Sequence, residues 1–437
     1  METNLEADFK ELRQVFNSGK TKESSWRISQ LHGLLHILED REDDISMALK
    51  QDLGKHHVEA YRDEIGTVVK SVNYALKNLN QWMAGKKASL PLAAFPSTAE
   101  LLPEPLGVVL IISSWNFPFG LSLEPMIGAI AAGNAIVLKP SELAPSCSSF
   151  LAETIRDYLD NSAIKVIEGG SATGERLLEH KFDKIFFTAA AQHLTPVTLE
   201  LGGKCPAVVD SLSVSGDANV ELLKKYVTQF YGDGPKGSHS MSNIINKKHF
   251  SRLKSLLDEP RVKSSIVHGG LLDEESLFIW PTILVDPPLD AAIMTEEIFG
   301  PLLPVITLER IEESIEFIRA RPKPLALYAF TKNGNFQKGL ISETSSGSVM
   351  FNDVILQYAV DTLPFGGVGE SGFGRYHGKY SFENFSHEKV VLTRSFFIDF
   401  WFRYPPWDDK KLQLIKSGLR FDYLGFLLIA LGLKSKA

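Results

Sequence analysis

The sequence predicts an α/β protein built around a doubly wound parallel sheet. Between residues 105 and 197, short strands rich in β-branched residues alternate with helical patterns, which is typical of this arrangement. The chain has 437 residues, enough for two or three domains with a sizeable core. Its 44% hydrophobic and 23% charged residues indicate a soluble globular protein.

The elements follow in order along the chain. Residues up to about 84 are expected to form helices, because apolar residues recur at helical spacing on two faces that we expect to lie in the core: Phe9, Leu12 and Phe16, then Ile28, Leu31, Leu35 and Leu38. Apolar runs at residues 108–112 and 135–138 predict strands. Residues 184–188 and 198–201 predict two more strands, but the stretch 189–197 is too short for the usual helical crossover between parallel neighbours. A helix is predicted at residues 220–231, with an apolar face and a stop at Gly232.

Composition excludes several functional classes. The formal net charge of -7 and the absence of a basic stripe with interleaved aromatic residues argue against a nucleic-acid partner. The two cysteines form no disulfide framework, which suits a reducing compartment. The charged N-terminus contains no secretory signal, so we expect a cytoplasmic protein. Neither a G-x-G-x-x-G motif nor a P-loop occurs, and no metal site is predicted.

Five motifs occur in a fixed order over most of the chain: WNFP at 115–118, KPSE at 139–142, LELGGK at 199–204, EEIFGP at 296–301, and a glycine-rich turn at 364–372. Each string alone is a weak match, but the ordered set resembles the aldehyde dehydrogenases. The segments KPSELAPS, RPKPLALYAFT and SHEKVVL most resemble the class 3, or family 3, members.

The resemblance implies catalytic roles for two residues. Asn116 corresponds to the asparagine whose side-chain amide donates to the substrate oxygen as this oxygen gains charge. Glu200 corresponds to the general base. The alternatives are a turn asparagine and an ordinary carboxylate at a strand end.

The resemblance also implies a site for NAD or NADP. Lys139 and Glu142 match the pair that holds the adenine-side ribose, and Glu297 and Phe299 match the residues beside the nicotinamide ribose and ring. As alternatives, Pro140 and Glu142 would suit the start of a helix, and Glu297 would be a surface carboxylate.

The implied fold is aldehyde dehydrogenase-like and locally truncated. A dinucleotide-binding domain would comprise residues 1–84 and 105–198, and a catalytic α/β domain residues 199–386, both of them incomplete. Residues 85–104 and 387–409 would form bridging strands for oligomerisation, giving a homodimer or a pairing with another family member.

Two departures from the family pattern affect the expected activity. The glycine-rich strand with the nucleophilic cysteine should follow LELGGK, but residues 207–210 lead into a polar stretch and then the helix at 220–231. Cys205, in an extended chain, would lie about 16 Å from Glu200 on the opposite face, and Cys147 is expected to be a buried small hydrophobe. Three alanines at 189–191 replace the family's turn and helix that help to hold the cofactor pyrophosphate, so we expect one βαβ unit to be broken.

The C-terminal tail, residues 410–437, carries six Lys or Arg against one Asp and an apolar run at 423–433. This run is shorter than the roughly 20 residues needed to cross a bilayer. It would lie at the surface of an anionic membrane or pack on protein.

The sequence thus predicts an NAD(P)-dependent aldehyde dehydrogenase that oxidises a small-molecule aldehyde to a carboxylic acid, with little activity. The alternative is an inactive relative that acts as an interaction partner or is an unstable truncated product.

Overall fold

The structure is a computed structural model that describes residues 5–91, 94–186, 195–210, 216–232, 240–397 and 399–433. The chain forms two compact units. The first comprises Met1–Asn80 and Pro105–Ser386, and the second comprises Gln81–Glu104 and His387–Ala437. Each unit is described below by itself.

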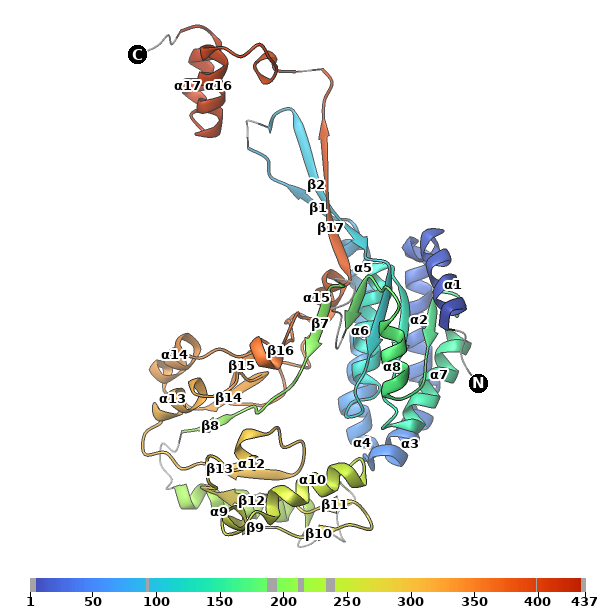
Figure 1. The fold of residues 1–437 in the computed structure, drawn as a ribbon, viewed down its shortest axis with the longest axis vertical. Helices are drawn as coiled ribbons and strands as arrows, with labels where there is room; N and C mark the ends of the chain where they lie inside the picture. The colour runs from blue at the N-terminus through green and yellow to red at the C-terminus, as the bar shows by residue number, and fades with distance from the viewer. Residues whose placement is uncertain are drawn as a thin grey trace. The chain divides into compact units, whose positions relative to one another are not determined.

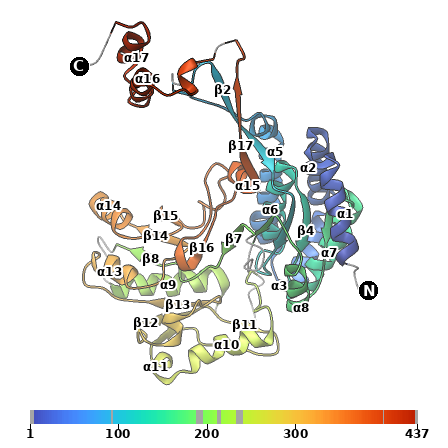
Figure 2. The ribbon, with the colours of Figure 1, turned by 45° about the horizontal axis from the view of Figure 1, so that its top comes forward.

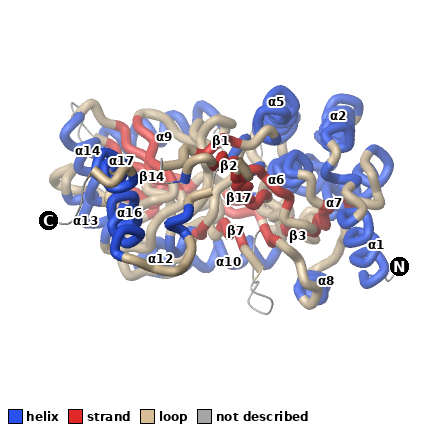
Figure 3. The backbone as a smooth tube through the Cα atoms, turned by 90° about the horizontal axis from the view of Figure 1, so that it is seen from above, coloured by secondary structure: helices blue, strands red, loops and turns tan. Residues whose placement is uncertain are grey.

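The first unit opens with the predicted helical layer, drawn in blue in Figure 1. Its elements are α1 (Leu5–Asn17), α2 (Ser24–Asp40), α3 (Glu42–Leu53), α4 (His57–Ala60), the π-helix η2 (Tyr61–Ile65) and α5 (Gly66–Met83). Leu12, Leu31 and Leu38 are fully buried, and the other predicted core residues of these two faces are partly buried, so the expected core faces are confirmed in part. Figure 3 shows α1 beside the N-terminus.

A six-stranded sheet follows, with the strand order β16-β7-β6-β3-β4-β5. Its strands are β3 (Val108–Ile112), β4 (Ala135–Lys139), β5 (Ile164–Val166), β6 (Lys184–Phe186), β7 (Val197–Glu200) and β16 (Gly372–Phe373). All neighbours pair in parallel except β16, which runs antiparallel to β7. The helices between the strands are α6 (Gly120–Ala132), α7 (Pro145–Tyr158) and α8 (Ser171–Leu178). The predicted doubly wound α/β class is confirmed.

Helices cover both faces of this sheet. Alternate residues of β3 and β4, among them Val108 and Val137, form a buried cluster with Leu12 of α1 and Leu177 of α8. Because successive strand residues point to opposite faces, the intervening residues such as Val109 face the other side. There α6 packs against β3 and β4. This two-sided burial explains why both strands are continuous apolar runs.

The expected break between β6 and β7 is wrong as far as strand pairing is concerned. Ile185 pairs with Val197 and Phe186 with Thr198, both in parallel. Only two positions are paired in this way, so the pairing needs less chain than a full-length crossover. The expected loss of a helix and a phosphate-binding turn falls on residues 187–194, which lie outside the described residues.

The rest of the first unit contains two smaller mixed or parallel sheets, visible in Figure 2. One has the order β15-β14-β8 and the other β13-β12-β9, and a hairpin pairs β10 with β11. The strands are β8 (Ala207–Val209), β9 (Ile266–His268), β10 (Leu272–Asp273), β11 (Phe278–Ile279), β12 (Thr282–Val285), β13 (Leu302–Val305), β14 (Ala326–Phe330) and β15 (Ser348–Phe351). The helices are α9 (Gly216–Tyr231), α10 (Lys247–Asp258), α11 (Pro260–Lys263), α12 (Ala292–Thr295), α13 (Glu313–Arg319), α14 (Gly334–Glu343) and α15 (Gly378–Asn384).

Helix α9 confirms the helix predicted at residues 220–231, and Gly232 follows it with φ 83°. Its apolar face is not covered by the described residues. None of residues 218–231 is buried, and Phe230 is 62% exposed. The helix therefore presents apolar side chains to its surroundings.

The second unit contains a three-stranded sheet and a helical C-terminal part. The strands β1 (Lys86–Ala88), β2 (Ser97–Pro105) and β17 (Ser386–Arg394) lie in the order β1-β2-β17. The last helices, α16 (Asp409–Leu419) and α17 (Tyr423–Ala430), pack against each other. Among the described residues, no helix is long and apolar enough to cross a bilayer.

Candidate active site

Three of the sequence-predicted residues lie at the carboxyl ends of strands in the six-stranded sheet. Lys139 is the last residue of β4, Glu200 is the last residue of β7, and Asn116 lies in the loop that follows β3. In open α/β sheets this edge is where ligands bind. Helix α7 begins at Pro145, so the alternative reading of Pro140 and Glu142 as a helix start is wrong.

Glu200 is held by the strand beside it and by one tyrosine. Its backbone pairs with Gly372 of β16, and the Tyr376 hydroxyl donates to Glu200 Oε2 at 3.1 Å. The other carboxylate oxygen, Oε1, is buried and has no partner among the described residues. Burial raises the pKa of Glu200 to about 7, and the bond from Tyr376 acts in the opposite direction. A carboxylate with this pKa can take up and release a proton near neutral pH.

Replacing Tyr376 with phenylalanine is expected to raise the pKa of Glu200 above its value of about 7, because Tyr376→Phe removes the bond that favours the ionised form. A neutral hydrogen bond of ordinary strength corresponds to roughly half to one pH unit. Infrared difference spectra recorded over a pH series would follow the carboxyl, with Glu200→Gln identifying its band. Tyr380→Phe, on the neighbouring helix α15, is the matched control. An unchanged pKa in Tyr376→Phe would contradict the assignment.

Lys139 and Glu142 form the expected pair. Lys139 Nζ donates to Glu142 Oε2 at 3.0 Å, and Lys139 is buried whereas Glu142 is partly exposed. Burial of Glu142 opposes ionisation, but hydrogen bonds from its own backbone and from Lys139 lower its pKa below the ordinary value. Gly170 and Gly174 lie over the pair, since a Cβ added there would approach Glu142 Cγ and Lys139 Cε at 3.8 Å each. A buried ammonium and an accessible carboxylate beside side-chain-free backbone fit the two hydroxyls of a ribose.

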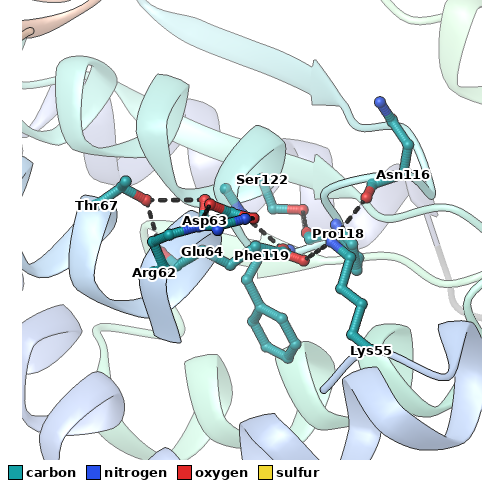
Figure 4. Close-up of polar contacts among 10 residues, drawn as sticks. Lys55, Arg62, Asp63, Glu64, Thr67, Asn116, Pro118, Phe119 and Ser122 are labelled. Carbon is teal, nitrogen blue, oxygen red and sulfur yellow. Dashed lines mark hydrogen bonds and ion pairs between the residues drawn. The ribbon is translucent and has the colours of Figure 1, made fainter. Parts of the chain in front are cut away.

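Asn116 lies in a tightly held loop. Its carbonyl oxygen accepts a bond from Lys55 Nζ at 3.0 Å. Its side-chain Oδ1 is buried without a partner among the described residues. Figure 4 shows the Asn116 side chain pointing away from Lys55.

Glu297 and Phe299 lie in another part of the unit. Glu297 Oε1 accepts from the backbone N–H of Gly203, which belongs to the LELGGK motif. The Phe299 ring meets Trp115 edge-on with centroids 5.2 Å apart. The structure thus brings motifs 199–204, 296–301 and 115–118 into contact.

A cavity of about 280 Å³ adjoins this aromatic contact. Its lining mixes apolar and polar side chains: Glu59, Trp115, Tyr231, Ser240, Met241, Ser242, Asn243, Ile244, Ile245, His249, Phe299 and Pro301. Small-molecule sites combine apolar and aromatic side chains with polar groups that fix the orientation of the ligand.

Neither cysteine is bonded to Glu200. Cys147 is fully buried in α7, where burial raises the pKa of its thiol well above the usual range, which agrees with the expected structural role. The expectation of an extended chain between Glu200 and Cys205 is wrong, because Gly202 and Gly203 have φ of 72° and 112° and turn it. Burial raises the pKa of Cys205, and the nearby charge of Glu297 adds to this.

The sequence reasoning missed three residues that shape the site: Tyr376, Lys55 and Glu64. Tyr376 lies just after the glycine-rich turn at 364–372, and that neighbourhood was the available signal. Lys55 and Glu64 form a buried ion pair at 2.5 Å in the helical layer, which carries no motif. The periodicity of a helix or strand cannot predict that these residues contact the loop of Asn116.

Comparison with known proteins agrees with the motif order. The model of the aldehyde dehydrogenase family matches residues 2–213 and 212–391. Aldehyde dehydrogenase family 3 member F1 of Arabidopsis thaliana is 49% identical over 480 positions, covering 99% of both chains. Family 3 member A2 of Rattus norvegicus is 41% identical, covering 94% of this chain and 93% of its own.

The fold also matches solved structures. The substrate-bound state of Staphylococcus aureus AldH superposes with a TM-score of 0.91 at 40% identity, covering 95% of this chain and 100% of that one. The family model and the relatives each cover most of the chain. The chain therefore belongs to the aldehyde dehydrogenase family of NAD(P)-dependent oxidoreductases, and its relatives are members of family 3.

Proposed function

We propose that this chain oxidises an aldehyde to a carboxylic acid at the carboxyl edge of the six-stranded sheet, with Glu200 as general base and Asn116 as the donor to the substrate oxygen. The observation that carries this proposal is Glu200 itself. A buried carboxylate with a pKa of about 7, and with one oxygen that has no partner among the described residues, is suited to take a proton from an attacking oxygen nucleophile at neutral pH.

Lys139 and Glu142 hold the adenine-side ribose of NAD or NADP in this proposal, and Glu297 and Phe299 lie beside the nicotinamide end. The geometry of the Lys139–Glu142 pair under Gly170 and Gly174 supports the first assignment. Two structures of the same fold are complexes with NADP, for the Methanocaldococcus jannaschii enzyme GapN, and with NAD+, for the Pseudomonas syringae enzyme AldA. When bound, the cofactor accepts the hydride.

The remaining chemistry needs a tetrahedral carbon from which the hydride can leave. In this chain we infer that water is the nucleophile that forms it by attacking the carbonyl carbon. Glu200 takes a proton from a water molecule, the water oxygen bonds to the carbonyl carbon, and the former carbonyl oxygen accepts from the Asn116 amide. Loss of the hydride from that carbon then leaves the carboxylic acid, and the proton taken from water stays on Glu200.

Water takes this part because the segment with the family's nucleophilic cysteine is missing between β8 and α9. The alignment with the Arabidopsis relative supports this, since its 480 positions exceed the 437 residues of the chain by 43. The family model matches in two pieces that meet at residues 212 and 213, between β8 and α9. A gap of this kind would also explain the uncovered face of α9.

The substrate is an apolar aldehyde of medium or long chain. The cavity beside Trp115 and Phe299 supports this, because Met241, Ile244 and Ile245 add further apolar lining.

NADH formation measured with a medium-chain aldehyde tests the proposal. The wild-type chain is expected to form NADH slowly in an aldehyde-dependent way, and Glu200→Gln is expected to lose this activity because the amide accepts no proton. Glu153→Gln, an exposed glutamate on α7, is the matched control. Equal background rates in wild type and Glu200→Gln would refute the proposal.

The second unit is proposed to serve association. β17 forms an edge of its three-stranded sheet, and Val390 and Leu392 on it are exposed, which suits pairing with a second copy or another family member. Analytical ultracentrifugation would reveal a dimer.

The C-terminal helices are proposed to contact an anionic membrane. Leu424, Leu427 and Leu431 are exposed on and beside α17, and the basic residues of the tail lie nearby in sequence. Deletion of residues 410–437 is expected to abolish sedimentation with vesicles that contain phosphatidylserine. Vesicles of phosphatidylcholine alone are the control. Unchanged sedimentation after the deletion would exclude the membrane role.

A further inference from the structure

We propose that Lys55 and Glu64 are positioning residues that hold the loop between β3 and α6 and thereby present the Asn116 side chain to the substrate oxygen. This inference rests on the role given to Asn116 under the proposed function. It assigns to the helical layer, which carries none of the family motifs quoted above, a part in organising the site.

Lys55 contacts the loop at two consecutive residues. Its Nζ donates to the carbonyl oxygen of Asn116 at 3.0 Å and lies 4.3 Å from the centre of the Phe117 ring. The same ammonium pairs with Glu64 Oε1 at 2.5 Å. Lys55 is buried, so water does not compete for these contacts.

Glu64 holds the other end of the loop. Its second oxygen, Oε2, accepts from the backbone N–H of Phe119 at 2.9 Å and of Gly120 at 3.3 Å, where α6 begins. These donors have no partner within the helix. Glu64 is fully buried and lies in the π-helix η2, an irregular turn that is frequent at functional sites.

Serine hydroxyls fix the loop from its other side. Ser122 Oγ donates to the carbonyl oxygen of Pro118 at 2.6 Å, and Ser113 and Ser122 share a bond of 2.7 Å. Figure 4 shows Lys55 and Glu64 directed at the backbone of this loop, while the Asn116 side chain projects away from them. Because these contacts hold the loop backbone, the Asn116 side chain can point in few directions.

A buried ion pair is weak support for stability alone, because apolar residues of similar volume are often as stabilising. The geometry points to a positional role instead. Besides pairing with each other, both charged groups form hydrogen bonds with backbone atoms of residues 116, 119 and 120. Among the described residues, Glu124 and His377 form the other ion pair in which both side chains are less than 10% exposed. That pair makes no hydrogen bond to a described loop of the proposed site.

A double-mutant cycle tests whether Lys55 acts through Asn116. The probe is octanamide, an unreactive carbonyl compound, and its dissociation constant is measured by calorimetry. Asn116→Ala is expected to weaken binding about 2- to 10-fold through loss of one donor. Lys55→Met is expected to weaken it comparably, and the variant with both changes is expected to be no weaker than Asn116→Ala alone. Lys184→Met, at the opposite end of the sheet strands, is the control for loss of a buried lysine.

A spectroscopic measurement makes the test independent of the ligand. In chain labelled isotopically at asparagine, the Asn116 signals are identified by their loss in Asn116→Ala. Lys55→Met is expected to shift or broaden these signals, and Lys184→Met is expected to leave them in place. Should Lys55→Met fail to fold, the variant with methionine at both 55 and 64 replaces it, because it leaves no unpaired buried charge.

The outcomes separate the two proposals. If Asn116→Ala weakens binding but Lys55→Met does not, or if the two effects add, the positioning role is wrong and the proposed function stands. If octanamide does not bind, or binds Asn116→Ala as well as wild type, the role of Asn116 is wrong and the inference falls with it.

Discussion

Aldehyde oxidation by this chain is expected to be slower than by a cysteine-bearing family 3 relative by a factor on the order of a million, which is the loss seen when an essential nucleophile is removed from another covalent enzyme. The physical reason is that water is a weaker nucleophile than a thiolate and forms the tetrahedral adduct less readily. NADH formation at saturating aldehyde, compared with the Arabidopsis relative under the same conditions, measures the ratio.

The two thiols supply the control. Cys147→Ala and Cys205→Ala are each expected to leave the slow rate unchanged, because Cys147 is fully buried and burial raises the pKa of both thiols. A thiol-blocking reagent should likewise have no effect on this chain while inactivating the relative. Mass spectrometry that detected an acyl group on either cysteine would overturn the expectation.

Glu124→Gln is expected to stabilise the chain increasingly as the pH rises from 5 to 8. Glu124 lies in α6 and is buried, and burial raises its pKa from 4.5 to about 8, against the effect of the Ser71 hydroxyl. Between these two values the folded chain keeps a proton that the unfolded chain has released. The free energy of unfolding therefore falls as the pH rises, by roughly 1.4 kcal/mol per pH unit. Glutamine does not titrate, so the variant escapes this loss.

His377 contributes with the opposite sign. Its Nδ1 lies 4.0 Å from Glu124 Oε2, and burial lowers its pKa from 6.5 to about 3. The unfolded chain therefore binds the extra proton between pH 3 and 6.5, and this group makes stability rise with pH there. Above pH 6.5 only the effect of the carboxyl groups remains, with Glu200 adding to that of Glu124 up to about pH 7. His377 and Glu200 are present in both chains, so their contributions cancel in the difference between Glu124→Gln and wild type.

Urea unfolding at several pH values measures this dependence. The gap in unfolding free energy between Glu124→Gln and wild type is expected to widen over the stated range. Glu153→Gln, at an exposed position, should follow wild type throughout. A gap that stays constant with pH would mean that Glu124 is ionised in the folded chain.

Local patterns were enough to predict much of the fold. β3 coincides with the apolar run at 108–112 and β4 extends that at 135–138 by one residue, because a strand buried on both faces needs an unbroken apolar run. Helix α9 ends where Gly232 was expected to end it. The assignment of roles to Asn116, Lys139 and Glu297 came from motif resemblance and stays a prediction.

Long-range contacts could not be predicted in this way. The bond from Tyr376 to Glu200 joins residues 176 positions apart, and the bond from Lys55 to Asn116 joins residues 61 positions apart. The usual length of a crossover predicts that β6 and β7 do not pair, although pairing at two positions needs much less chain. The sequence also predicts an extended path after Glu200, although Gly202 and Gly203 allow positive φ and turn the chain.

The exposed face of α9 has a consequence for handling the protein. Leu222, Tyr226 and Phe230 are each more than 40% exposed on one helix. Contiguous apolar surface of this kind favours association between molecules. A helix with so much of its surface exposed among the described residues is also more readily opened and cleaved by proteases. We therefore expect the recombinant protein to aggregate at high concentration. We also expect trypsin to cleave the chain first after Lys224 or Lys225.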